Sequence, residues 1–259
     1  MSSGLSWRAG LVWRRNAEVT LKTWHLNLLP PLAEPLFYIL AFGAGMGALV
    51  KTVPYHGRDI PYIAFVAPGM VGVTMMFQAY FECTFGSFIR MYYQKTFDAI
   101  IATPCSLADV AAGEIAWGAT RSLSATALML CVLWPFGLAA MPQSLWMLPL
   151  ALAAGWCFAA AAFCLAALVP HIDTFNIPMH LVLIPMFTVS ETFFPLPASG
   201  WLRTVGEWMP LTHVTRIARA AALGEFSWAL AWRTEAALVA AGLGFSILGL
   251  RLMRRRLIP

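Results

Sequence analysis

The stretch MYYQKTFDAIIATPCSLADVAAGE, residues 91–114, is a polar interruption between two long apolar runs. Phe97, Ile100 and Ile101 recur at helical spacing, which predicts a short amphipathic helix at the membrane surface. Thr103-Pro104 ends this helix, because proline lacks an amide proton and disfavours helical geometry in the residue before it. The rest of the chain is arranged on either side of this segment.

The residues after the break predict the start of another helix. Ser106 followed by Asp109 resembles a capping box, with aspartate in place of the usual glutamate or glutamine. Residues 90–106 therefore form a cytoplasmic segment between two membrane spans. This segment is either a coupling element that transmits the motion of a soluble partner, or an ordinary loop on the lipid headgroups.

The composition is that of an integral membrane protein. Of the 259 residues, 60% are hydrophobic and 11% are charged, and the mean hydropathy is +0.71. Soluble domains contain about 25% charged residues. The net charge of +5 comes from basic residues near predicted span ends, which fits the positive-inside rule and argues against a nucleic-acid partner.

Apolar runs predict an all-α membrane protein with six spans, forming one transmembrane domain over residues 1–259. An even number of spans places both termini on the same side. By this assignment eleven of the seventeen lysines and arginines lie on the terminal side, which predicts cytoplasmic termini. The predicted spans cover about residues 32–50, 60–89, 122–139, 145–168, 176–193 and 228–250.

Two further segments are neither spans nor simple loops. Residues 8–29, within the N-terminal segment 1–29, place Trp13 and Trp24 on one helical face and Arg8 and Arg15 on the other. This pattern predicts a helix in the membrane surface, ended by Pro30-Pro31, with its basic face toward anionic headgroups. Residues 193–226 are too polar to span and predict two short helices, about 200–209 and 211–223, dipping into the outer leaflet.

The sequence lacks the motifs of several enzyme classes. None of its three lysines follows a glycine, which excludes a Walker A loop, and neither HExxH nor GxSxG occurs. The five cysteines form no CxxC pair and are interpreted as core residues, with neither disulfides nor metal ligands. We therefore predict no catalytic, metal or cofactor site in this chain.

Three acids within or near the predicted spans are candidates for a transport pathway. Glu34, Glu82 and Glu191 would each cost several kcal/mol in hydrocarbon unless paired or hydrated. The structural alternative is that Glu34 caps a helix start, Glu82 pairs with a nearby arginine and Glu191 reaches the interface.

Several stretches together resemble the nodulation protein J branch of the type-2 ABC exporter permeases. They are EPLFYILAFGAGMGALV (34–50), PYIAFVAPGM (61–70), FDAIIATPCSLADVAAGEIAWGATRS (97–122) and FFPLP with PLTHVTRIAR (193–219). The resemblance implies a bacterial inner-membrane permease that dimerises and pairs with two copies of an ABC ATPase, which would bind ATP and Mg²⁺. Family members export lipid-linked oligosaccharides, and relatives export drugs or polysaccharides.

The resemblance also implies functional positions. The N-terminal helix and a coupling helix at about 91–102 would contact the ATPase, with VPHIDTFN (169–176) as a second contact. Glu191 stands where the resemblance leads us to expect a small residue, which places a carboxylate near the outer mouth. The implied coupling residues are Tyr93, Phe97, Asp98, Ile100, Ile101, His171 and Asp173, and the pathway or gate candidates are Glu34, Glu82, Glu191, Phe193 and Phe194.

Three functional hypotheses follow. The first is an ATP-driven exporter of a lipid-linked oligosaccharide or similar amphipathic molecule. The second keeps this architecture and changes the cargo to drugs or antibiotics. The third is a membrane enzyme or a proton-coupled carrier that uses Glu82 and Glu191.

Overall fold

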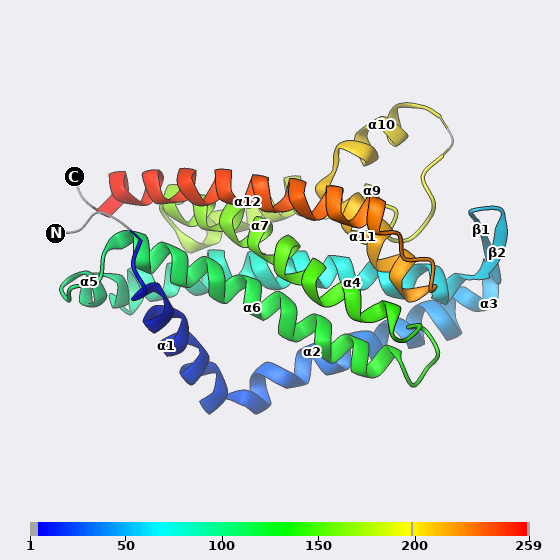
Figure 1. Ribbon diagram of the computed structural model, residues 1–259, viewed down its shortest axis with the longest axis horizontal. Helices are drawn as coiled ribbons and strands as arrows, with labels where there is room; N and C mark the ends of the chain where they lie inside the picture. The colour runs from blue at the N-terminus through cyan, green and yellow to red at the C-terminus, as the bar shows by residue number, and fades with distance from the viewer. Residues whose placement is uncertain (1–4, 198, 258–259) are drawn as a thin grey trace.

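Long helices lie side by side in an elongated bundle (Figure 1). The computed structural model describes residues 5–197 and 199–257. The first and last described segments of the chain lie at one end of the bundle, called here the terminal end, and a β-hairpin marks the other, the hairpin end. Six helical stretches are long and apolar enough to cross a membrane, which confirms the six predicted spans: Leu29–Leu49, Tyr62–Tyr93, Leu107–Leu133, Gln143–Leu168, Ile172–Val189 and Ala231–Leu257.

The spans contain both α-helical and π-helical segments. The α-helices are α1 (Ala9–Lys22), α2 (Trp24–Tyr38), α3 (Gly47–Leu49), α4 (Tyr62–Phe81), α5 (Thr96–Ile101), α6 (Leu107–Leu133), α7 (Met147–Leu168), α8 (Asn176–Pro178), α9 (Ile184–Val189), α10 (Trp201–Trp208), α11 (Pro210–Ala222) and α12 (Trp228–Leu257). Wider π-helical turns cover Ile39–Met46, Glu82–Gly86, Ile89–Tyr93 and Met179–Leu183.

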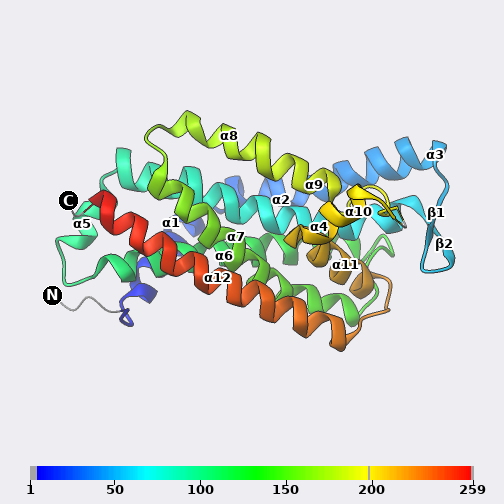
Figure 2. The same cartoon turned by 90° about the horizontal axis from the view of Figure 1, so that it is seen from above.

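The second, third and fourth spans form the centre of the bundle, and the other three are largely exposed on its outside (Figure 2). Glycines permit the close approach of the central helices. A Cβ on Gly118 would lie 2.8 Å from the Ala159 Cβ, and one on Gly155 would lie 2.6 Å from the Ser122 Cβ. This close fit of α6 on α7 buries the core.

The N-terminal prediction was wrong about where the helix ends. The chain bends at Thr23, and α2 then continues through Pro30, Pro31 and Pro35 into the first span. Proline removes a hydrogen bond, but its fixed φ is compatible with a helix. At the bend, the Asn27 Nδ2 donates to the Thr23 carbonyl over 3.0 Å and stabilises it.

The third span also starts earlier than predicted. Ser106 and Asp109 form the predicted capping box, and α6 then runs unbroken from Leu107 to Leu133. Glu114 is buried inside this span, although the prediction placed it in a cytoplasmic extension. The span ends before 139, because the chain turns at Gly137, where φ is +70°.

The segment between the second and third spans is more compact than predicted. The second span extends to Tyr93, so residues 91–93 belong to it and not to a coupling helix. Lys95 adopts a left-handed conformation with φ of 52° and reverses the chain. The helix α5 that follows has only six residues.

The hairpin end is formed by two short strands and two short helices. Strands β1 (Thr52–Tyr55) and β2 (Arg58–Pro61) pair antiparallel around His56-Gly57, both with positive φ as a tight hairpin turn requires. Helices α10 and α11 occupy the two short segments predicted after the fifth span. The last span extends beyond residue 250 and includes the C-terminal arginines.

Candidate functional site

A buried charged cluster joins three helices near the terminal end. It consists of Asn16 on α1, Glu82, Ser87 and Arg90 on the second span, and Glu114 and Arg121 on α6. The Glu114 carboxylate accepts hydrogen bonds from Asn16 Nδ2 at 2.8 Å, Ser87 Oγ at 2.6 Å, and Arg90 Nε and Nη2 at 2.9 and 2.7 Å. These bonds explain how a carboxylate with 1% exposure is tolerated in the core.

Arg90 also binds a second acid in the charged cluster. Its Nη1 lies 2.8 Å from the Glu82 Oε1, and the Arg121 Nε approaches the Glu82 Oε2 at 3.6 Å. Gly86 makes room for this pair, since a Cβ there would lie 3.0 Å from the Glu82 carboxylate. The structural alternative for Glu82, that it pairs with a nearby arginine, is confirmed.

Sequence reasoning missed most of the charged cluster. It placed Arg90, Glu114 and Arg121 at span ends or in a loop on the cytoplasmic side. The capping box at Ser106 was the available signal, because a helix starting there carries Glu114 two turns into the span. The π-helical turns on either side of Ser87 could not be predicted from periodicity, and such turns are frequent at functional sites.

Helix α5 is connected to the charged cluster through α1. The Arg15 guanidinium donates to the Asn16 Oδ1 at 3.2 Å and to the Thr96 Oγ1 at 3.4 Å. Asp98 is exposed, and Ile100 and Ile101 are half-buried.

Two residues proposed for coupling lie elsewhere than predicted. Phe97 is fully buried and anchors α5 to the core, so it offers no surface to a partner. Tyr93 lies at the end of the second span and is 61% exposed.

The start of α1 is docked on the loop and helix that follow α5. The Asp109 carboxylate accepts from the backbone N–H of Ser6 at 2.7 Å as well as from Ser106. The Arg8 side chain donates to the Pro104 carbonyl. Arg8 and Arg15 thus contact protein, which corrects the prediction that they face lipid headgroups.

The second predicted contact, residues 169–176, lies against the same end of the second span. Phe175 is buried, with ring centroids 5.2 Å from Phe85 and 5.5 Å from Phe88. His171 and Asp173 are exposed. Both predicted contact segments therefore rest on the π-helical end of one span.

A second polar site, the outer latch, lies at the hairpin end. Glu191 has φ of +57° and pairs with Arg216, whose Nε and Nη2 donate at 2.6 and 3.1 Å. The sequence did not predict this ion-pair partner of Glu191. The fully buried Arg219 donates to the carbonyls of Phe65 and Glu191, with its guanidinium 3.7 Å from the Phe65 ring centroid. The outer latch holds α11 on α4.

The two phenylalanines after the outer latch are placed differently. Phe193 lies against Phe42 and Phe187, with ring centroids 5.4 and 5.1 Å away. Phe194 is 47% exposed. Phe193 therefore joins the first span to the fifth, while Phe194 faces outward.

Comparison with known proteins agrees with this arrangement. Residues 9–223 match the ABC-2 type transporter family. The chain belongs to the ABC-2 type transporter family. The permease is 33% identical to nodulation protein J of Sinorhizobium fredii over 97% of this chain and 95% of the relative. It is likewise 33% identical to nodulation protein J of Rhizobium meliloti, over 100% of this chain and 96% of the relative. A more distant relative is the inner membrane transport permease YadH of Escherichia coli, 23% identical over 43% of this chain and 42% of the relative.

Family membership and the six spans make this chain a multi-pass membrane protein and the permease component of an exporter. The resemblance to the nodulation protein J branch is confirmed over nearly the whole chain. Helices α1 and α5 and residues 169–176 therefore all lie within the part of the chain that matches the family.

The third pathway candidate lies deep in the permease. Glu34 accepts hydrogen bonds from the Tyr38 hydroxyl at 2.6 Å and the Thr74 hydroxyl at 2.9 Å. It lies inside α2, so the alternative that it caps a helix start was wrong. Thr74 is about 18 Å along α4 from Tyr62, at 1.5 Å per residue. Glu34, Glu82 and Glu191 each have their own hydrogen-bonding partners and form no shared site in the described part of the chain.

The outer latch should weaken at acid pH. Burial raises the pKa of Glu191, but the hydrogen bond and charge of Arg216 more than offset this, so its pKa lies below the usual range. A depressed folded-state pKa stabilises the fold above the unfolded-state pKa, and this contribution disappears as the pH falls through the folded-state pKa. We expect hydrogen exchange in residues 193–226 to accelerate several-fold at acid pH, and Glu191→Gln to have the same effect at neutral pH.

The matched control for the outer latch is Glu207→Gln. Glu207 forms an i,i+4 pair with Arg203 on the exposed surface of α10. It should leave the exchange pattern unchanged, since such pairs contribute little. Equal exchange in Glu191→Gln and the unmodified permease would contradict a latch.

Proposed function

We propose that the permease forms a homodimer, works with two copies of a separate ABC ATPase, and exports a lipid-linked oligosaccharide or a similar amphipathic molecule. Its relatives are called nodulation protein J, and that branch supports this class of cargo. The cargo would leave from the cytoplasm or inner leaflet of the bacterial inner membrane. ATP and Mg²⁺ would be bound by the ATPase.

The observation that carries this proposal is the charged cluster behind α5. Glu114 and Arg90 join the second and third spans, Asn16 adds α1, and Arg15 reaches Thr96 at the start of α5. Pairs of buried charges resist separation, because each would lose its partner in a medium of low polarity. A push on α5 would therefore move α1 and two central spans as one unit.

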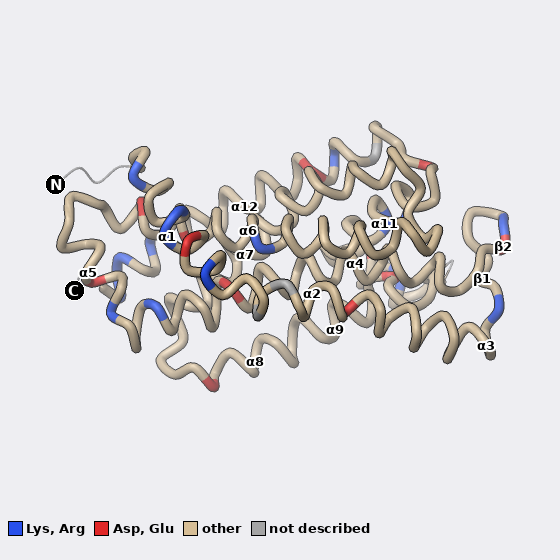
Figure 3. Tube along the Cα trace, turned by 90° about the horizontal axis from the view of Figure 1, so that it is seen from below, with Lys and Arg blue, Asp and Glu red and all other residues tan. Residues whose placement is uncertain are grey.

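The terminal end offers the surface for the ATPase. Asp98 on α5 and His171 and Asp173 in the second contact segment are exposed there. Charged residues are concentrated toward this end of the permease (Figure 3). The excess of lysine and arginine supports placing this end and both termini in the cytoplasm.

The hairpin end would form the exit. Phe193 and Phe194 follow the strained Glu191, and α10 carries Trp201 and Trp208, which are 77% and 82% exposed. Exposed tryptophans on a short helix favour the membrane interface. Opening would separate α11 from α4 at the outer latch and let an amphipathic molecule pass into the outer leaflet.

The ion pairs argue against a proton-coupled carrier. Such a carrier needs an acid that changes its protonation state, but Glu82 lies 2.8 Å from Arg90 and Glu191 lies 2.6 Å from Arg216. Burial raises the pKa of Glu191, but the hydrogen bond and charge of Arg216 more than offset this and favour its ionised form. The ATP-driven mechanism needs no such titration.

The test is a change on the exposed face of α5. Asp98→Arg with Ala99→Trp should reduce cargo export at least tenfold, because both positions are exposed on the proposed ATPase contact. Export would be measured in vesicles loaded with the glycolipid fraction or with drugs. Copurification of the ATPase with each variant would be measured in parallel. Phe97→Asp is unsuitable, because it would bury a charge and disrupt the permease itself.

Ala48→Trp is the matched control, since Ala48 is exposed near the hairpin end, far from α5. It should export normally. Unchanged export in a correctly inserted α5 variant would refute the coupling role. If the permease exports drugs and the export of glycolipids is unaffected, the cargo is a drug or antibiotic. If export requires the proton gradient and proceeds without an ATPase, the protein is a proton-coupled carrier.

A further inference from the structure

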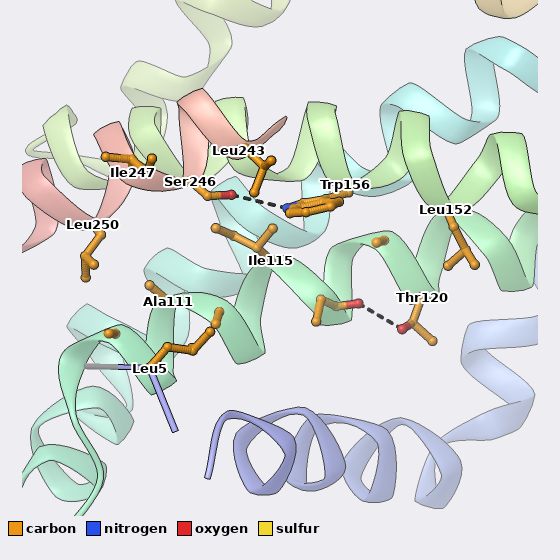
Figure 4. A pocket seen from close by; sticks show the side chains of 14 residues that line it. Leu5, Ala111, Ile115, Thr120, Leu152, Trp156, Leu243, Ser246, Ile247 and Leu250 are labelled. Carbon is orange, nitrogen blue, oxygen red and sulfur yellow. Dashed lines mark hydrogen bonds between the residues drawn. The ribbon is translucent and has the colours of Figure 1, made fainter. Parts of the chain in front are cut away.

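An apolar groove of about 610 Å³ lies between α6, α7 and α12 (Figure 4). Its polar side chains are satisfied within the chain. The Trp156 Nε1 donates to the Ser246 Oγ at 3.2 Å, and the Thr120 hydroxyl donates to the Ala116 carbonyl at 2.8 Å. Such a lining does not select one apolar occupant over another. A smaller pocket on the second span is different, because its lining carries charge.

This smaller pocket has a volume of about 150 Å³ and lies between α1 and the terminal part of the second span. It is called here the arginine pocket, and its lining includes Arg15, Thr20, Gly86, Arg90 and Gln94. The second span ends at Tyr93, so the pocket lies beside the last turns of the span and the residue that follows it. In a membrane the end of a span is level with the lipid headgroups.

The Arg15 guanidinium has only neutral hydrogen-bond partners in the described part of the chain. It donates to the Asn16 Oδ1 at 3.2 Å and to the Thr96 Oγ1 at 3.4 Å. These bonds use two of the five N–H groups of a guanidinium. Arg15 forms no ion pair with a described carboxylate, unlike its neighbour Arg14, which pairs with Glu18. No contact therefore neutralises its charge.

The adjacent charged cluster does not supply the missing negative charge. Glu114 pairs with Arg90, and Glu82 pairs with both Arg90 and Arg121. With Arg15 there are thus three guanidinium groups for two carboxylates. Burial lowers the pKa of Arg15, the charge of Arg90 lowers it further, and Glu114 opposes this. An anion in the arginine pocket would stabilise the charged form of Arg15.

Gly86 opens the arginine pocket toward the second guanidinium. A Cβ on Gly86 would lie 3.3 Å from the Arg90 Nη2 and 3.4 Å from the Arg90 Nη1. A larger residue would cover these atoms. Since Arg90 already donates to Glu82 and Glu114, it contributes mainly positive potential to the pocket. Arg15 contributes the charged donor.

Two neutral donors complete the arginine pocket. Gln94 is exposed, and neither its side-chain amide nor the Thr20 hydroxyl makes a hydrogen bond among the described residues. Donors from α1 and from the end of the second span thus surround one space. The planar fork of a guanidinium matches the oxygens of a phosphate. A tetrahedral phosphate also accepts hydrogen bonds from several directions at once, which suits donors on two helical segments.

We propose that the arginine pocket binds a phosphate group through Arg15, Thr20 and Gln94. The phosphate is either the headgroup of an anionic phospholipid or free inorganic phosphate, since both present the same oxygens. Basic residues at a membrane surface attract such lipids. Bound here, the phosphate joins α1 to the second span and strengthens the docking of α1. The site does not depend on the cargo or on the ATPase proposed above.

The test measures ligand binding to the detergent-purified, full-length permease by isothermal titration and by thermal unfolding. The probes are inorganic phosphate at constant ionic strength and dihexanoyl phosphatidylglycerol, with dihexanoylglycerol as the lipid control without a phosphate. We expect a phosphate probe to raise the unfolding temperature by several degrees, because a ligand of the folded state stabilises it. Binding of inorganic phosphate would show that the free anion is sufficient. Binding of phosphatidylglycerol alone would identify a lipid headgroup.

Variants assign the binding to the arginine pocket. Arg15→Gln should weaken binding about tenfold, since it removes a charge-assisted hydrogen bond. Arg14→Gln is the matched control, because the Arg14 side chain is 71% exposed and pairs with Glu18, and it should bind like the unmodified permease. Gln94→Glu changes an exposed position, so the fold should be retained, and its carboxylate should exclude the phosphate.

Three results would overturn the proposal. The first is that neither phosphate probe binds. The second is that dihexanoylglycerol raises the unfolding temperature as much as phosphatidylglycerol does while inorganic phosphate has no effect, which would assign the binding to the acyl chains. The third is that Gln94→Glu binds the phosphate probes as tightly as the unmodified permease, a result that counts even if Arg15→Gln folds poorly.

Discussion

Replacing Arg90 by methionine is expected to destabilise the permease by about 3–5 kcal/mol, the usual cost of removing one partner from a buried ion pair. Arg90 binds both Glu114 and Glu82, and its loss would leave the nearly inaccessible Glu114 carboxylate without a positive partner. Thermal unfolding of the detergent-purified protein measures the loss. Export should fall to background, because α1 and the central spans would no longer move together.

Two companion variants show whether charge is the cause. Adding Glu114→Gln and Glu82→Gln to Arg90→Met should recover much of the stability, because the unpaired charges are removed with the arginine. Arg14→Met is the surface control, since the Arg14–Glu18 pair is 71% and 55% exposed and should contribute little. If the triple variant were as unstable as Arg90→Met alone, packing around the side chain would be responsible.

Replacing Gly113 by alanine is expected to detach α1 from α6. A Cβ at this position would lie 2.6 Å from the Val12 Cβ and 2.8 Å from the Ala9 carbonyl oxygen, so the helix has to move. Overpacking of this kind costs about 1–3 kcal/mol. It would also pull Asn16 away from Glu114. We expect export to be lost while the six spans remain folded, as measured by vesicle transport and circular dichroism.

The control for this variant lies on α1 itself. Gly10→Ala places the same methyl group where no atom lies within 4 Å, so export and folding should be unchanged. Normal export by Gly113→Ala would show that docked α1 is dispensable.

Most of the fold could be predicted from local features of the sequence. The six spans follow from apolar composition and length, and all but the third, which begins at Leu107 instead of about residue 122, were found close to their predicted places. The capping box at Ser106 involves residues only a few positions apart. The errors at Pro30 and Ser122 concerned helix boundaries, where tertiary packing overrides local preference.

The candidate sites could be predicted from the sequence only in part. Glu82 and Glu191 were identified as costly acids, but their partners were not. Arg90 meets Glu114 across 24 residues, and Glu191 meets Arg216 across 25. Phe97 was proposed as a contact surface because its spacing is amphipathic, and it is buried because α5 packs on the core.

The sequence by itself determined that this protein has six membrane spans, because hydropathy, helix length and capping depend on neighbouring residues and add up along the chain. Only the tertiary structure decided which charges meet and where α1 docks. Those contacts depend on the rotation of each helix about its axis and on π-helical turns at Glu82–Gly86 and Ile89–Tyr93. Helix rotation is set by packing between distant segments, such as Gly113 against Val12.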